Sequence, residues 1–128
     1  MQRTALSTDQ APKAIGPYSQ AIRKGSFLFL SGQIPLDPKA MTVTGTTASE
    51  QAEQVMKNLE AVLTAGGASF GDVVKTTIFL IDLEDFAAVN AVYGQRFEGI
   101  EPPARSTVQV SRLPRDVRVE IEMVAILG

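Results

Sequence analysis

The apolar residues between Thr47 and Ala65 recur three or four positions apart, which predicts a helix that is buried along one side. Thr47 and Glu50 fit a capping box at the start of this helix, and Gly66 with Gly67 provides a left-handed stop at its end. We expect the buried stripe to consist of Ala52, Val55, Met56, Leu59, Val62 and Leu63.

A second, shorter helix is predicted from about Leu83 to Phe97. Asp82 is a suitable N-cap for it, and Gly99 and Pro102 lie beyond its end, where helices commonly stop. The side chains expected to point inward from this helix are Phe86, Val89 and Tyr93.

Strand patterns occupy much of the remaining chain. The runs AIRK and SFLFLSGQI flank Lys24 and Gly25, which predicts a short β-hairpin. The run from Asp72 to Asp82 is β-branched and apolar almost throughout, as is typical of a central strand. A further alternating pattern begins at Arg105.

The last run, VRVEIEMVAIL, starts at Val117 and alternates with the period of a half-buried strand. Glu120 and Glu122 therefore share one face of this strand with Arg118. The opposite face carries Val119, Ile121 and Met123.

The predicted order of elements is β-β-α-β-α-β-β, which fits an α+β fold with two helices covering one face of a mixed sheet of five or six strands. The uncovered face still carries apolar side chains, so we expect it to be buried against other subunits of a homo-oligomer. Residues 35–46 are expected to form a long surface loop. We interpret residues 1–128 as a single domain, since domains commonly contain roughly 100–200 residues.

Composition narrows the chemistry that the chain can perform. It contains no Cys and no His, which excludes disulfides, thiol nucleophiles, Cys/His zinc sites and Ser-His-Asp triads. A formal net charge of −2 offers no attractive field to nucleic acid. No segment approaches the ~18 apolar residues of a membrane span, and the first ten residues lack the apolar core of a signal peptide, so a cytoplasmic location is expected.

Two charged residues are the main candidates for chemistry. Arg105 follows the stiff pair Pro102-Pro103, where its planar fork suits a ligand carboxylate, although an arginine at a strand edge is also commonly a solvated charge. Glu120 is a candidate general base that activates water, and Glu122 has the same claim on spacing alone. The alternative for Glu120 is a solvated carboxylate or an ion pair with Arg118 or a neighbouring strand.

Three further positions are candidates for ligand contacts. At Ser31-Gly32, the missing side chain would let a ligand approach a backbone N–H, but the pair is equally consistent with a bulge or a strand end. Tyr18 follows a Gly-Pro turn that directs its side chain either into a site or onto the rim of the fold. Asn90 is a poor helix former within the second helix, with either a binding role or a solvent-facing position.

Five stretches resemble the RidA/YjgF family of reactive-intermediate imine deaminases: AIGPYSQAI, LFLSGQIPLDP, VVKTTIFLIDLEDFAAVNAVY, PPARSTVQVSRLPRD and VEIEMVAI. They follow one another in the family's order and extend from about Ala14 to the C-terminus, so the resemblance is specific. It implies a chorismate-mutase-like α+β fold that forms a homotrimer with a barrel-like core and clefts at the subunit interfaces.

The same resemblance implies roles for individual residues. Arg105 would bind the substrate carboxylate, and Glu120 would position or activate the attacking water. The cleft would be lined by Tyr18, contributed by the neighbouring subunit, and by Ser31, Gly32, Asn90 and the backbone at Thr107. Many bacterial members carry Cys at this last position. Thr is harmless there if only the backbone N–H acts, whereas any role of the thiol would be absent from this chain.

The resemblance implies hydrolysis of reactive 2-imino acids, released by pyridoxal-phosphate-dependent threonine and serine dehydratases, to 2-oxo acids and ammonia, with no metal or cofactor. Two alternatives stay open. One is endoribonuclease or translation-inhibitor activity, against which the net charge of −2 argues. The other is a non-catalytic protein that binds small carboxylates or acts as a chaperone-like oligomer.

Overall fold

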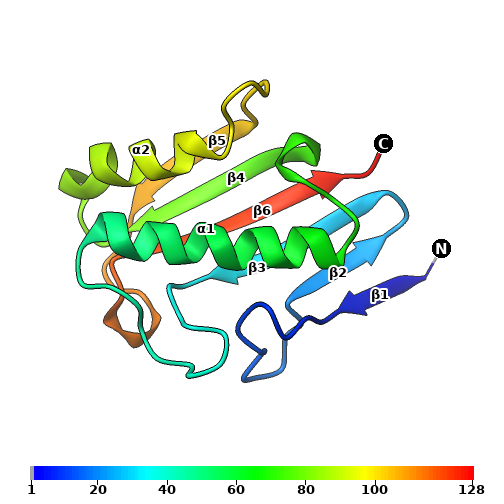
Figure 1. Cartoon of the computed structure of the whole chain (residues 1–128), viewed down its shortest axis with the longest axis horizontal. Coiled ribbons are helices and arrows are strands. Elements are labelled where there is room, and N and C mark those ends of the chain that lie inside the picture. The colour runs from blue at the N-terminus through cyan, green and yellow to red at the C-terminus, as the bar shows by residue number, and fades with distance from the viewer. Residues whose placement is uncertain (1) are drawn as a thin grey trace.

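The computed structural model describes residues 2–128 as a six-stranded mixed sheet with two α-helices on one face (Figure 1). Along the sheet the strands follow the order β1-β2-β3-β6-β4-β5, and within residues 2–128 only β4 and β5 are parallel neighbours. The strands are β1 (Arg3–Leu6), β2 (Ala21–Lys24), β3 (Phe27–Gln33), β4 (Val73–Leu80), β5 (Ala104–Gln109) and β6 (Val119–Ile126).

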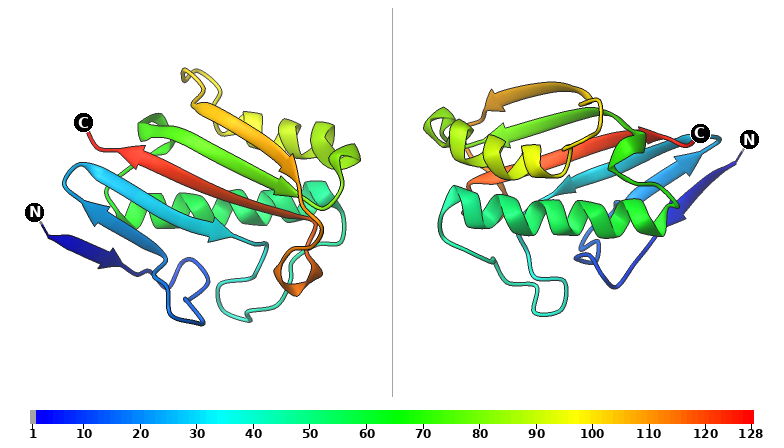
Figure 2. Two further views of the ribbon diagram at one scale, coloured as in Figure 1. Left: turned by 180° about the vertical axis from the view of Figure 1, so that it is seen from behind. Right: turned by 45° about the horizontal axis from the view of Figure 1, so that its top comes forward.

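Both helices, α1 (Ala48–Ala65) and α2 (Phe86–Gln95), lie on the same side of the sheet, and the view from behind shows the other face without a helix over it (Figure 2). Short 3-10 turns complete the elements at η1 (Phe70–Asp72), η2 (Leu83–Asp85) and η3 (Pro114–Asp116). The predicted α+β arrangement, with two helices on one face of a mixed sheet, is confirmed. None of the helices within residues 2–128 combines the length and apolar character needed to cross a membrane.

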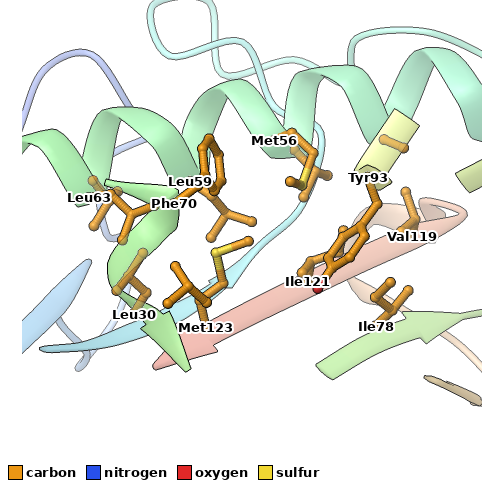
Figure 3. Close-up of a cluster of buried hydrophobic side chains, with 14 of the residues drawn as sticks. Leu30, Met56, Leu59, Leu63, Phe70, Ile78, Tyr93, Val119, Ile121 and Met123 are labelled. Atoms are coloured by element: carbon orange, nitrogen blue, oxygen red, sulfur yellow. The ribbon is translucent and has the colours of Figure 1, made fainter. Parts of the chain in front are cut away.

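The core fills the space between α1, α2 and the sheet (Figure 3). All six apolar residues of the predicted α1 stripe are buried, and the capping box between Thr47 and Glu50 is present. At the other end of α1, Gly67 supplies the left-handed residue with a φ of 77°. From the sheet, alternate side chains of β6 complete the core, namely Val119, Ile121, Met123 and Ala125.

Alternation in β6 assigns each of its side chains to a face of the sheet. Glu120 and Glu122 point away from the helices, as the sequence pattern predicted. The register places Glu120 beside Phe79 of β4 and Phe79 beside Val108 of β5, so this row of side chains lies on the uncovered face. The prediction that the uncovered face carries apolar groups is confirmed by four exposed side chains, Phe27, Phe29, Val108 and Ile126.

Three details differ from the sequence prediction. Strand β1 was missed because it is held by backbone pairing with β2, and three of its four side chains are exposed. The second helix begins with the 3-10 turn η2, capped by Asp82, and its α-helical part ends at Gln95. The prediction that Phe86 points inward was wrong, since this side chain is 36% exposed at the outer end of α2.

Candidate active site

A cavity of about 420 Å³ opens beside Glu120, near the start of β6. The loop before β2 contributes Tyr18 to its wall, and the end of β3 contributes Gly32. Apolar side chains provide much of the remaining lining, including Ile15, Ile34 and Leu36. The cavity has the size and mixed character of a small-molecule site.

Glu120 is half-buried, and no group within residues 2–128 hydrogen-bonds to its carboxylate or pairs with it as an ion. Burial raises the pKa of Glu120, and the negative charge of Glu122 on the same face raises it further. Arg118, its expected alternative partner, is bonded instead to Asp85 at 2.9 Å. The structure therefore holds a carboxylate with enhanced basicity in the cavity wall.

Gly32 leaves the space into which the Glu120 carboxylate fits. The register of β3 against β6 shifts between Leu30 and Gln33, so Gly32 lies at an irregularity of the strand. A Cβ added to Gly32 would overlap Oε2 of Glu120 and would lie 3.0 Å from its Cδ. In this chain, the space left by the missing side chain is filled by the carboxylate, which explains why glycine is needed there.

Two buried amide side chains hold the loops that line the cavity. Gln20 accepts a hydrogen bond from the backbone N–H of Thr8 and donates to carbonyls of the same loop, including that of Pro12 at 2.8 Å. Asn58 of α1 donates to the carbonyls of Ile34 and Leu36 at 3.3 and 3.0 Å. These bonds satisfy backbone groups that regular structure does not pair.

Sequence reasoning missed both of these amides. Asn58 could have been found, because it interrupts the apolar stripe of α1 midway between Val55 and Val62, and a polar residue at such a position needs buried partners. Gln20 carries no comparable sequence signal.

Tyr18 and Ser31 belong to the same part of the fold as Glu120. Tyr18 is 52% exposed at the cavity, and its hydroxyl accepts a 3.4 Å hydrogen bond from the backbone N–H of Ile15. The Ser31 hydroxyl donates to the carbonyl of Ser19 at 2.6 Å, so it closes the loop before β2 onto β3. Within one chain, Tyr18, Gly32 and Glu120 therefore share a cavity, and Ser31 supports its wall.

Arg105 lies elsewhere, on the edge strand β5 and beneath α2. It is next to a second cavity of about 330 Å³, lined by Tyr93, Pro102 and Pro103 in addition to Arg105 itself. Its Nη1 donates to Oδ1 of Asn90 at 2.7 Å. Both residues are exposed, and the guanidinium forms no ion pair within the described part of the chain.

Thr107 is the third candidate in this region. The register pairs it with Ile78, a core residue, so its side chain points to the helix side of β5. The Oγ1 atom is buried and finds no hydrogen-bond partner among residues 2–128.

The sheet separates the two charged candidates. Arg105 is paired in register with Thr76, whose buried hydroxyl bonds to Tyr93 of α2, and this places Arg105 on the helix side. Glu120 lies on the uncovered side. Arg105 and Glu120 of one chain consequently cannot hold the same small ligand.

A metal centre is not indicated within residues 2–128, where no three His, Cys, Asp or Glu side chains gather closely enough to hold an ion. The chemistry available at the Glu120 cavity is that of a basic carboxylate in a wall that is largely apolar but also carries Lys13 and Arg115.

The fold and the cavity define a small α+β protein with a carboxylate-bearing site, and known proteins of this kind match the chain closely. The family model described as Endoribonuclease L-PSP matches residues 8–127. The chain belongs to this family, which is also called the RidA/YjgF family.

Individual members match over nearly their whole length. Protein DfrA of Myxococcus xanthus is 59% identical, with 98% of this chain and 97% of the relative covered. The 2-iminobutanoate/2-iminopropanoate deaminase of Salmonella typhimurium is 49% identical, with 94% and 95% covered. The crystal structure of TdcF of Escherichia coli with bound serine is 43% identical, covers 98% of this chain and 99% of its own, and has a TM-score of 0.94.

Proposed function

We propose that this protein hydrolyses reactive 2-imino acids, such as 2-iminobutanoate and 2-iminopropanoate, to 2-oxo acids and ammonia. The observation that carries the proposal is the half-buried Glu120, whose carboxylate is unpaired within residues 2–128, whose pKa is raised, and which faces a cavity of about 420 Å³. Relatives that are 49% and 46% identical and bear the name of this activity support it.

The separation of Arg105 from Glu120 supports a site built by two copies of the chain. In this proposal, the cavity of one copy supplies Glu120, Tyr18 and Gly32, while the β5 edge of its neighbour supplies Arg105. The exposed apolar side chains of the uncovered face, Phe27, Phe29, Val108 and Ile126, would be buried between copies. We propose a homotrimer, in which each interface forms one such site.

The proposed reaction begins with the substrate carboxylate bound to the guanidinium of Arg105 through parallel hydrogen bonds. Glu120 then removes a proton from a water molecule as the water oxygen forms a bond to C2 of the protonated imine. The C=N double bond becomes single, giving a neutral carbinolamine and a protonated Glu120.

In the second step, Glu120 returns its proton to the nitrogen of the carbinolamine. The C–N bond breaks, the hydroxyl oxygen forms the carbonyl, and ammonia leaves with the released proton as ammonium. A protonated imine is already electrophilic, so placing the carboxylate, the water and the base accounts for the catalysis.

The other predicted site residues have supporting roles in this scheme. Gly32 leaves room for the Glu120 carboxylate, Ser31 fixes the loop beside it, and Tyr18 lines the cavity. Asn90 contacts the guanidinium of Arg105. The backbone at Thr107 would lie near the bound carboxylate on the neighbour's side.

A coupled assay tests the proposal. Threonine dehydratase generates the imine, semicarbazide traps it, and an active protein lowers the rate of trapping by converting the imine to 2-oxobutanoate. We expect Arg105→Ala to lose about 100-fold or more of this activity while keeping the oligomer, because the carboxylate anchor is gone. Arg23→Ala, at an exposed arginine of β2, is the matched control and should stay active. Full activity of Arg105→Ala would contradict the proposal.

Ribonuclease activity is the competing function, since the family's description names an endoribonuclease. RNA cleavage by purified protein that survives in Arg105→Ala would assign that activity to a different site. A protein that binds 2-oxobutanoate but never competes with semicarbazide would instead be a non-catalytic carboxylate binder.

A further inference from the structure

One side of α2 faces the guanidinium of Arg105 with three residues, Phe86, Asn90 and Tyr93. Their spacing of four and then three positions places them along one stripe of a helix. The sequence prediction treated Phe86 and Tyr93 as core residues and Asn90 as a ligand contact. The structure shows that all three contact the same cation.

Both aromatic rings lie within reach of a cation–π interaction with Arg105. The Cζ atom is 5.1 Å from the centroid of the Tyr93 ring and 5.4 Å from that of the Phe86 ring. Phe86 is 36% exposed, and its ring borders this surface arginine and does not enter the core.

Contacts with Thr76 and Phe97 fix the position of the Tyr93 side chain. Its side chain is buried, its hydroxyl lies 2.7 Å from Oγ1 of Thr76, and its ring packs on Phe97 with 4.8 Å between centroids. Thr76 is in turn the register partner of Arg105. The Tyr93 ring that contacts the guanidinium is therefore held both by α2 and by β4, the strand next to Arg105.

The hydrogen-bond partner of Arg105 is a neutral amide. Of the six other arginines in residues 2–128, three form ion pairs and three do not, the pairs being Arg96–Glu53, Arg112–Asp116 and Arg118–Asp85. A carboxylate at position 90 would hold the guanidinium equally well but would neutralise it. Asn90 accepts a hydrogen bond from one of the five N–H donors of Arg105. The positive charge and the remaining donors are left for an anionic ligand.

We propose that Phe86, Asn90 and Tyr93 are positioning residues that hold Arg105 in a fixed orientation without neutralising it. This inference rests on the proposed function, in which Arg105 binds the carboxylate of the substrate. The stripe acts through Arg105 alone, so it affects the affinity for any small 2-oxo or 2-imino carboxylate at that site. It gives the guanidinium a preorganised geometry before the ligand arrives.

Equilibrium binding of 2-oxobutanoate to the intact oligomer, measured by calorimetry, tests the role of the ring at position 86. Phe86→Leu keeps an apolar side chain but removes the ring, and we expect binding to weaken by about two- to fivefold, the value of one cation–π contact of 0.5–1 kcal/mol. Phe86→Tyr keeps the ring and should bind like the wild type. In the coupled assay, the loss in Phe86→Leu should appear mainly in KM.

Asn90→Asp tests whether the hydrogen-bond partner of Arg105 must be uncharged. This variant keeps the hydrogen-bond acceptor and adds a negative charge that competes with the ligand carboxylate, so we expect about five- to tenfold weaker binding. Gln95→Glu adds the same charge to an exposed position of α2 away from the stripe and should bind normally.

The outcomes separate this inference from the proposed function. Wild-type affinity in Arg105→Ala would overturn both the carboxylate role of Arg105 and the inference. Loss of binding in Arg105→Ala, together with wild-type affinity in folded Phe86→Leu and Asn90→Asp oligomers, would overturn the inference alone. Equal losses in Phe86→Leu and Phe86→Tyr would also contradict it, because the ring would then have no special role.

Discussion

Arg105 and Glu120 stand on opposite faces of one sheet, and they are held in different ways. Arg105 is exposed, rests against two rings of α2 and bonds to a neutral amide. Glu120 is half-buried beside loops that the side chains of Gln20 and Asn58 hold through hydrogen bonds. Arg105 is thus held at the surface by α2 and β5, whereas the Glu120 carboxylate lies in a cavity that is partly lined by loops.

In the described part of the chain, neither charged side chain has an ion-pair partner in its own region. Within residues 2–128, Arg105 forms no ion pair with a carboxylate, and Glu120 forms none with a cation, although Lys13 and Arg115 also line the Glu120 cavity. Each of the two regions therefore suits a different part of the same ligand. In the proposed oligomer, contact between two copies would bring the regions together.

The largest expected effect comes from mixing two inactive variants. Arg105→Ala and Glu120→Gln should each lose nearly all imine hydrolysis. After unfolding and refolding together, they should regain about a quarter of the wild-type activity per site, because that share of interfaces in a random cyclic oligomer combines an intact Arg105 with an intact Glu120. The coupled semicarbazide assay measures this recovery.

The control for that experiment is the double variant carrying both substitutions in one chain, refolded with wild-type protein. It should produce fewer active sites than wild-type protein alone and show no recovery. Absence of recovery in mixed oligomers, shown to contain both single variants by mass spectrometry, would mean that the two residues do not share an intersubunit site.

Gly32→Ala is expected to have the next largest effect. The added Cβ would overlap Oε2 of Glu120 and displace the carboxylate, and a misplacement of this kind costs up to about 100-fold in kcat. The unfolding midpoint should change little, since the displaced group is the end of a flexible side chain. Gly94→Ala on α2 is the matched control, because among residues 2–128 an added Cβ there meets nothing within 4 Å apart from its chain neighbours and the backbone of its own helix. Unchanged kcat in Gly32→Ala would show that the position of Glu120 is unimportant.

The smallest expected effect concerns pH. Glu120 must be ionised to accept a proton, so its raised pKa predicts that kcat/KM declines on acidification at a higher pH than for an ordinary glutamate. Glu122→Gln removes one of the two causes of the raised pKa, and it should move this decline to lower pH. The pH profile of the coupled assay measures the shift, with oligomer size checked in parallel. An unchanged pH profile would show that the charge of Glu122 does not affect the pKa of Glu120.

Much of the fold followed from local patterns. The stripe and caps of α1 and the alternation of β6 were predicted because burial on one side imposes a period on the sequence. Strand β1 was not predicted, since its stability comes from pairing with β2 and leaves no apolar period. Phe86 was misassigned because a helical period does not distinguish a core contact from a contact with a surface arginine.

The residue types available for chemistry, the order of the elements after β1, and the polar face of β6 that carries Glu120 could all be inferred from the amino-acid sequence. Family motifs added a pairing between Arg105 and Glu120, which local patterns could not provide. Their separation by the sheet became visible only in the folded structure, because the side of the sheet that a residue occupies depends on strand register and on where the helices pack. The same is true of the contacts that Phe86, Asn90 and Tyr93 make with Arg105, since α2 and β5 meet only when the chain folds.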